Sequence, residues 1–281
     1  MAENTAQTDT SSCAEVSTAL NEPMIGSAPQ VGLWILLEVR DVWEPKNLET
    51  NTLPDVANQW IDDAIVRGET DGLMPRAQFI RHRRRPSDPL TVMTYRDGEL
   101  RRQEIDDYDE LAEIDPLDYR IPKCDELLYF VCTHARRDIC CSREGLPTWQ
   151  RLDVLSEGRA WQTTHLGGHR FAPNVLTLPT ARSYGRVRVD EVDEFFAEIE
   201  SGSVPTRFLR GNSTLPPDAQ VCEPEILSHD GRYVSLSDIE VTYETASGMH
   251  TLPIPAKSNL QILAGCRERE WKTVEVYDVS D

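Results

Sequence analysis

The chain has 281 residues, of which 29 are Lys or Arg and 48 are Asp or Glu, so its formal net charge is −19. This acidity argues against nonspecific binding to nucleic acid or to an anionic membrane, because the phosphate groups would be repelled. The length suits two domains, and a hydrophobic content of 39% allows a packed core. The longest apolar runs, at 33–37 and 127–132, are far shorter than the ~20 residues of a transmembrane helix.

Residues 1–30 are polar and lack the basic and apolar regions of a secretory signal, so we expect a cytoplasmic protein. There, structural disulfides are rare, and grouped cysteines more often bind metal or take part in catalysis. The sequence has seven cysteines but no Cys-x-x-Cys pair, which argues against a thioredoxin-type dithiol enzyme.

The elements of the first half follow a mobile lead-in, expected at 1–30. Within 31–121, the sequence predicts a buried strand at 33–37 and a helix that begins at Pro54 and ends at Gly68. Strands at 77–82, 90–95 and 99–105 follow, with a hairpin turn at Asp97-Gly98 and a short acidic helix at 108–114.

The second half, 122–212, repeats this order. A strand is expected at 127–131, a helix from Pro147, a strand at 159–163, paired strands at 174–178 and 184–189, and a helix capped by Asp190. A β-α-β unit followed by a β-β-α unit is the order of the thioredoxin fold. We therefore predict an α/β (α+β) fold with two thioredoxin-like halves, the second carrying the functional site.

Pro216-Pro217 marks a boundary before a small β appendage at 213–281. Its strands are expected at 238–244, 249–254, 260–263 and 272–277, where β-branched and aromatic residues alternate with turn residues.

Four residues of metal-ligand type fall together in the second half: Cys132, Cys141, His165 and His169. Cys132 ends a predicted strand, where open α/β sheets usually hold ligands. Gly167-Gly168, between the histidines, favours a loop that wraps a metal centre. The His spacing fits zinc, but eight residues separate the cysteines, which is wider than zinc sites usually have. Iron–sulfur clusters tolerate such gaps. From spacing alone an iron–sulfur centre, a zinc site and no metal all remain open.

The segments VCTH at 131–134, DICC at 138–141 and HLGGHRFAPNVL at 165–176 resemble the sucrase/ferredoxin-like family. The resemblance covers about residues 13–210, including the lead-in and the Tyr184-Gly185-Arg186 turn. It implies a thioredoxin-like ferredoxin domain with a [2Fe-2S] cluster held by Cys132, Cys141, His165 and His169. The family name also mentions sucrase, but no diagnostic glycosidase carboxylate pair is evident.

The resulting expectation is an electron carrier rather than an enzyme. No dinucleotide-binding fingerprint is present, so a separate reductase would donate the electron and an unknown redox partner would accept it. We expect no nucleic-acid or membrane partner. The alternatives are a zinc-binding interaction module, a cluster-dependent reductase and a hydrolase.

Weaker candidates surround the four residues. Cys140 is an alternative ligand, although adjacent cysteines point to opposite sides of an extended chain. His134 is expected to face solvent or to hydrogen-bond a cluster sulfur, and Cys13 and Cys266 to pack in the core. Four arginines near the ligands are expected to be solvated surface, or else to dock a partner or tune the reduction potential: Arg136, Arg137, Arg143 and Arg170. The basic run 81–85 is expected to be a solvated edge strand, or else to bind an anion.

Overall fold

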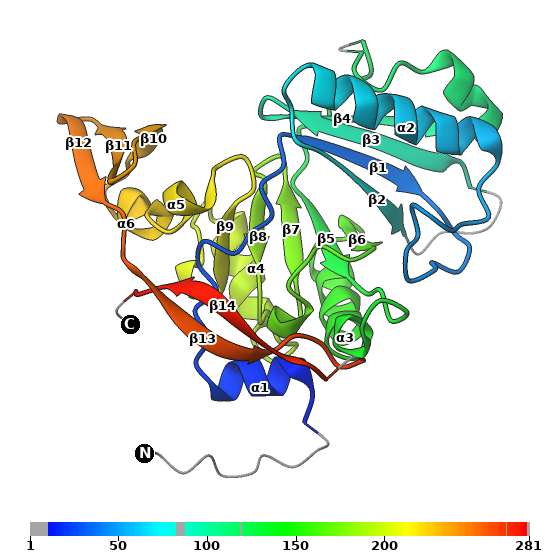
Figure 1. Ribbon diagram of the computed structural model, residues 1–281. Helices are drawn as coiled ribbons and strands as arrows, with labels where there is room; N and C mark the ends of the chain where they lie inside the picture. The colour runs from blue at the N-terminus through cyan, green and yellow to red at the C-terminus, as the bar shows by residue number, and fades with distance from the viewer. Residues whose placement is uncertain (1–10, 83–87, 119, 268, 280–281) are drawn as a thin grey trace.

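The computed structural model describes residues 11–82, 88–118, 120–267 and 269–279. Within these ranges nine strands form one sheet, in the order β4-β3-β1-β2-β6-β5-β7-β8-β9 (Figure 1). Two smaller sheets belong to the C-terminal region.

The first half has the predicted order of elements. β1 and β2 are parallel, β3 is antiparallel to β1, and β4 is antiparallel to β3. The helix α2 covers one face of these strands (Figure 1). The elements are β1 (Leu33–Glu38), α2 (Asp55–Thr70), β2 (Pro75–Arg81), β3 (Leu90–Arg96), β4 (Glu99–Ile105) and a 3-10 helix η1 (Tyr108–Glu113).

The second half repeats this arrangement. Its strand order β6-β5-β7-β8 corresponds to β2-β1-β3-β4, which confirms two thioredoxin-like halves in an α/β fold. The elements are β5 (Leu128–Cys132), α3 (Ile139–Leu155), β6 (Ala160–Thr163), the 3-10 helix η2 (His169–Phe171), β7 (Val175–Leu178), β8 (Arg182–Tyr184), α4 (Val192–Glu200), the 3-10 helix η3 (Thr206–Phe208) and β9 (Leu209–Asn212).

The halves meet edge to edge through β2 and β6, which pair antiparallel at Ile80↔Thr163 and Arg81↔Gln162. Successive side chains of the buried strands point to opposite faces of the sheet. Trp34 and Phe130 belong to a core shared by both halves, whereas Ile35 packs under α2. Cys132 lies in the shared core, so the candidate site forms where the halves meet.

The helix that follows β5 begins earlier than the sequence predicts. It starts at Ile139 rather than Pro147, because Asp138 caps it and its side chain accepts a hydrogen bond of 2.9 Å from the Cys140 N–H. Pro147 lies inside the helix. The early start brings Cys140 and Cys141 into the first turn of α3.

The hairpin partner of β7 is also displaced. β8 ends at Tyr184, and 185–189 leave the sheet rather than continuing the strand to 189. Arg186 adopts a left-handed backbone conformation with φ 55°, and its N–H donates to Phe171 O at 2.7 Å. The turn thereby holds the loop that carries the two histidines.

Much of the lead-in is ordered, contrary to the expectation for 1–30. The helix α1 (Cys13–Ala19) begins with a capping box in which Ser12 and Glu15 bind each other's backbone N–H groups. Cys13 and Val16 are buried against the second half. The apolar face of this seven-residue helix is masked in the sequence by the polar residues around it.

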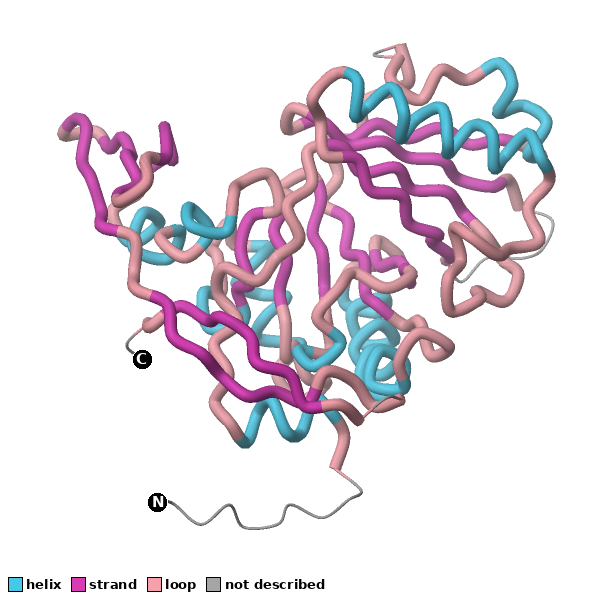
Figure 2. Tube along the Cα trace, viewed as in Figure 1, coloured by secondary structure: helices cyan, strands magenta, loops and turns pink. Residues whose placement is uncertain are grey.

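The C-terminal region forms the predicted β appendage, preceded by α5 (Pro217–Gln220) and α6 (Glu223–Ser228). The three-stranded sheet of β10 (Arg232–Leu236), β11 (Glu240–Thr245) and β12 (Gly248–Pro253) stands apart from the large sheet (Figure 2). The hairpin of β13 (Lys257–Leu263) and β14 (Trp271–Tyr277) returns to contact α1 (Figure 1). No helix in the described part of the chain is long and apolar enough to cross a membrane.

Candidate metal centre

Three of the four predicted ligands converge at the carboxyl end of β5. The ligand atoms of Cys132, Cys141 and His165 all lie within 4.8 Å of one another. Cys132 is the last residue of β5, Cys141 belongs to the first turn of α3, and His165 follows β6. The Cys141 Sγ atom is 3.5 Å from His165 Nδ1. The arrangement offers soft sulfur and imidazole donors to a transition metal.

The surroundings of the two cysteines shift the pKa values of their thiols in opposite directions. Burial alone would raise the pKa of the Cys132 thiol, but hydrogen bonds from Cys141 and His165 outweigh burial and hold this pKa well below its usual value. The same hydrogen bond from Cys141 to Cys132 raises the pKa of Cys141. Cys132 is therefore poised as a thiolate, the form that binds metal.

The approach of α3 to Cys132 depends on Gly145. A Cβ atom at this position would lie 2.2 Å from the Cys132 carbonyl oxygen, which no real contact allows. Glycine therefore lets α3 pack directly against the end of β5 and brings Cys141 beside Cys132.

The loop that carries the histidines is held from both halves of the molecule. Arg76 of β2 donates to His165 O at 2.9 Å. Arg210 of β9 donates to Gly167 O at 3.0 Å and to Asn174 Oδ1 at 2.8 Å. Gly168 has φ +66°, and a Cβ atom there would lie 2.7 Å from the Arg210 guanidinium. The Gly167-Gly168 loop thus fits closely around a buried arginine.

Arg76 and Arg210 also supply positive charge. Arg210 is only 2% exposed, and burial lowers its pKa to about 9. Burial likewise lowers the pKa of Arg76, although a Cys132 thiolate partly offsets this effect for both arginines. A thiolate at Cys132 is therefore close to positive charge from Arg76 of the first half and from Arg210 of the second half.

His169 lies beside this group rather than within it. Its ring centroid is 5.3 Å from that of His165. Its Nδ1 atom faces away, 3.4 Å from Cys13 Sγ and 3.3 Å from Asp138 Oδ2. Burial lowers the pKa of His169, against the opposing effect of the Asp138 carboxylate. Ligation by this side chain would therefore use Nε2.

A second group of metal-ligand type lies on the other side of His169. It consists of Cys13, Asp138, Cys140 and Cys266, whose ligand atoms are again all within 4.8 Å of one another. Cys140 points into this group and not toward Cys132. Sequence reasoning missed the group because Cys13 and Cys266 are separated by almost the whole chain, and their spacing gave no signal.

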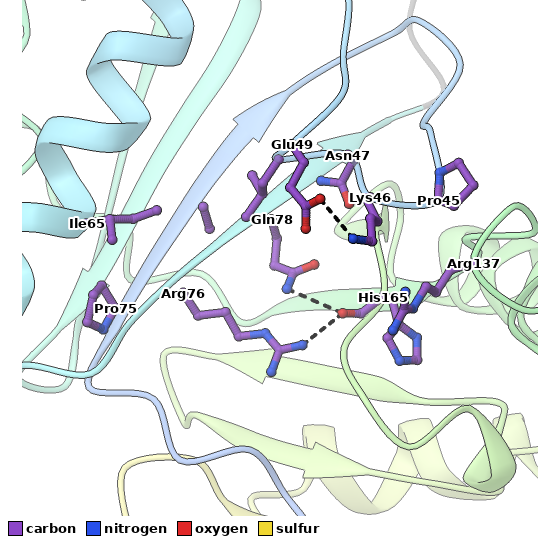
Figure 3. A pocket seen from close by; sticks show the side chains of 12 residues that line it. Pro45, Lys46, Asn47, Glu49, Ile65, Pro75, Arg76, Gln78, Arg137 and His165 are labelled. Atoms are coloured by element: carbon purple, nitrogen blue, oxygen red, sulfur yellow. Dashed lines mark hydrogen bonds and ion pairs between the residues drawn. The ribbon is translucent and has the colours of Figure 1, made fainter. Parts of the chain in front are cut away.

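A pocket of about 380 Å³ opens beside His165, between the two halves (Figure 3). The first half contributes Lys46 and Arg76 to its wall, and the second half contributes Arg137. Arg76 points at the His165 carbonyl oxygen (Figure 3). The pocket gives solvent or a partner access to the edge of the site.

Other candidates have structural partners. His134 is buried, so it does not face solvent as expected. Its Nε2 atom lies 2.9 Å from Glu44 O and is therefore not directed at the sulfurs of the site. Three of the nearby arginines are ion-paired: Arg136 with Glu44, Arg143 with Glu144 and Arg170 with Glu22. Most of the basic run 81–85 lies outside the described residues.

Comparisons with known proteins agree with the resemblance. The model of the sucrase/ferredoxin-like family matches residues 24–211. The Candida glabrata protein named "Altered inheritance of mitochondria protein 32" is 26% identical over 156 residues, which cover 50% of this chain and 50% of that protein. The chain thus spans about half the length of this curated relative.

A solved thioredoxin-like [2Fe-2S] ferredoxin from Aquifex aeolicus also matches, with 18% identity and a TM-score of 0.28 over 33% of this chain and 97% of that one. The family match covers about two thirds of the sequence and includes all four predicted ligands. The chain belongs to the sucrase/ferredoxin-like family.

Proposed function

We propose that this chain is a cytoplasmic electron-transfer protein that holds a [2Fe-2S] cluster through Cys132, Cys141, His165 and His169. The observation that carries the proposal is the convergence of Cys132, Cys141 and His165 at the end of β5, with the His169 ring beside His165. Two irons need ligands on two sides, so four ligands need not crowd around one point.

When bound, such a cluster accepts and releases one electron at a time. The chain's own residues favour this chemistry. The guanidinium groups of the half-buried Arg76 and the buried Arg210 interact favourably with a thiolate at Cys132, so they stabilise added negative charge. Leu166 is 2% exposed and helps to keep water from the sulfurs. The hydrogen bonds on the histidine loop restrict its movement.

The proposed partners are a separate reductase, which donates the electron, and an unidentified redox acceptor. The pocket beside His165 is where we place the contact with a partner. Lys46 forms an ion pair with Glu49 in the pocket wall, which leaves the charges of Arg76 and Arg137 in excess there. These two arginines contrast with the overall charge of −19 and suit an acidic partner surface. We expect neither nucleic acid nor a membrane among the partners.

A cluster-dependent reductase is the second candidate, favoured by the same pocket. Its volume of about 380 Å³ falls in the range of small-molecule sites. Turnover of a small electron acceptor that saturates with its concentration and disappears with the cluster would favour the reductase over a simple carrier.

Absorption spectroscopy and metal analysis of the purified full chain test the proposed function. We expect a coloured protein with about two irons per chain, as one [2Fe-2S] cluster requires. The first half cannot hold a second cluster of the ordinary kind, because residues 31–120 contain no cysteine and only one histidine, His82. A colourless protein with zinc bound by Cys132 and Cys141 would contradict the proposal and favour the interaction module.

A further inference from the structure

The second group of donors brings three distant segments to one point. Cys13 begins α1, Cys140 lies in the first turn of α3, and Cys266 lies between β13 and β14. Their Sγ atoms form a closed triangle, with 3.5 Å between Cys13 and Cys140, 3.2 Å between Cys140 and Cys266, and 3.5 Å between Cys266 and Cys13.

A buried carboxylate completes the group. The Asp138 side chain is 3% exposed, and its Oδ1 atom lies 3.9 Å from Cys13 Sγ. Backbone N–H groups of Cys140 and Cys266 both donate to this carboxylate at 2.9 Å. These bonds fix Asp138 among the sulfurs and attach the Cys266 segment to α3.

We infer that Cys13, Cys140 and Cys266, together with Asp138, form a second metal site that binds a zinc ion. Three sulfurs and one carboxylate oxygen are an appropriate tetrahedral set, since zinc accepts both donor types. With Zn–S bonds of about 2.3 Å, two ligating sulfurs lie about 3.8 Å apart. The observed triangle needs to expand by only a few tenths of an ångström.

Simple packing explains less of this arrangement. A buried thiol behaves as a small apolar side chain, and Cys13 and Cys140 do join a small apolar cluster. Helix capping accounts for the buried Asp138 carboxylate, which accepts hydrogen bonds from the Cys140 and Cys266 N–H groups. Neither capping nor apolar packing accounts for the three thiol sulfurs that gather beside it. A disulfide would use two of the three sulfurs and leave the third beside Asp138. A metal ion uses all four groups.

The site would act as a structural clamp. Zinc binding at a structural site contributes directly to folding stability. Here the ion would join the N-terminal helix and the C-terminal hairpin to α3, which also carries the proposed cluster ligand Cys141. The two proposed sites share no ligand, but they are in contact, because His169 Nδ1 lies 3.4 Å from Cys13 Sγ and 3.3 Å from Asp138 Oδ2.

The test is metal analysis of the full chain, produced with zinc supplied and washed with a chelator. We expect about one zinc per chain, lost in Cys266→Ser and retained in Cys222→Ser. Cys222 is a buried cysteine outside both groups, so it controls for loss of a thiol. Cys266 is half-buried at a hairpin connection, where a change to serine disturbs packing little.

Limited proteolysis supplies a second readout. The Cys266→Ser chain should be cleaved faster near α1 and the β13–β14 hairpin, while its visible colour persists. If that variant does not fold, X-ray absorption at the zinc edge of the unmodified chain serves instead, with sulfur scatterers expected at about 2.3 Å. The inference is overturned by an unmodified chain without zinc, by zinc that survives Cys266→Ser, or by a disulfide among these cysteines.

The outcomes for the two sites are distinguishable. A colourless chain that holds zinc sensitive to Cys266→Ser would refute the proposed electron carrier and support the clamp. A coloured chain without zinc would do the opposite.

Discussion

The two halves of the large sheet have the same strand order but end their first strand differently. β5 ends at Cys132, beside Cys141 and His165. β1 ends at Glu38, which is fully buried and accepts hydrogen bonds from Thr91 N and Arg40 Nε, each of 3.0 Å. The same position in the repeated fold thus carries a candidate metal ligand in one half and a carboxylate that pairs with Arg40 in the other. Strand order provides the place for a site, and a few side chains decide whether one exists.

The first half nevertheless takes part in the site. Its strand β2 contributes Arg76, which binds the His165 carbonyl oxygen, and its loop contributes Lys46 to the pocket. One half therefore carries the proposed ligands, and the other contributes Arg76 and Lys46 beside them.

The largest effect is expected from the cysteines of the second half. Cys132→Ser or Cys141→Ser should remove most of the iron and the colour, because each removes a thiolate ligand. Cys222→Ser is the matched control, since Cys222 is buried outside both groups, and Cys140→Ser tests the neighbouring cysteine, which points to the other group. Iron analysis of these variants decides the matter. A colourless Cys140→Ser protein beside a coloured Cys141→Ser protein would exchange the roles of the two neighbours.

The next effect concerns the contribution of the first half. Arg76→Ala removes the hydrogen bond to the histidine loop and a half-buried positive charge, so we expect iron to be held about 10–100-fold less tightly, as for other residues that orient metal ligands. Competition with an iron chelator measures this change. Arg151→Ala is the control, because Arg151 pairs with Asp193 on the surface. Equal retention by both variants would show that the first half does not support the site.

Glu38→Ala tests whether the hydrogen-bonded end of β1 has a purely structural role. Removing the carboxylate leaves the buried Thr91 N–H without its acceptor, which should lower the free energy of unfolding by about 1–3 kcal/mol. The iron content should not change. Denaturant titration and iron analysis of the same samples provide both numbers. Loss of iron without loss of stability would contradict the separation of roles between the strand ends.

The smallest effect concerns an ion pair in each half, Arg67–Asp115 at 2.7 Å and Arg159–Glu200 at 2.9 Å. Hydrogen bonding to Arg159 lowers the pKa of Glu200, and hydrogen bonding to Arg67 lowers that of Asp115. A lowered carboxyl pKa stabilises the fold above the unfolded-state pKa, and this contribution is lost as the pH falls through the folded-state pKa.

Glu200→Gln and Asp115→Asn should therefore each cost less than about 1 kcal/mol at neutral pH and nothing in strong acid. The Arg159–Glu200 pair is the less exposed of the two, so Glu200→Gln should cost more. Unfolding titrations at several pH values test the order. A larger cost for Asp115→Asn than for Glu200→Gln would contradict the predicted order.

The sequence predicted the repeated strand order because buried strands have distinctive apolar runs, and it predicted the Cys132, Cys141 and His165 group because a known motif contains it. It did not predict the start of α3, since Pro147 was a stronger signal than the Asp138 cap. It could not place Arg76 or Arg210 at the site, because the contacts depend on how β2 and β9 meet the histidine loop. The Cys13, Cys140 and Cys266 group was missed for the same reason, since only the fold joins these segments.

The most direct test of the central claim is hyperfine spectroscopy of the chemically reduced full chain, with histidine labelled by nitrogen-15. A cluster held by two cysteines and two histidines predicts strong coupling of the electron spin to histidine nitrogen, changed by the label and reduced in His169→Ala. Absence of any histidine nitrogen coupling in a chain that still holds two irons would contradict the ligand set of Cys132, Cys141, His165 and His169.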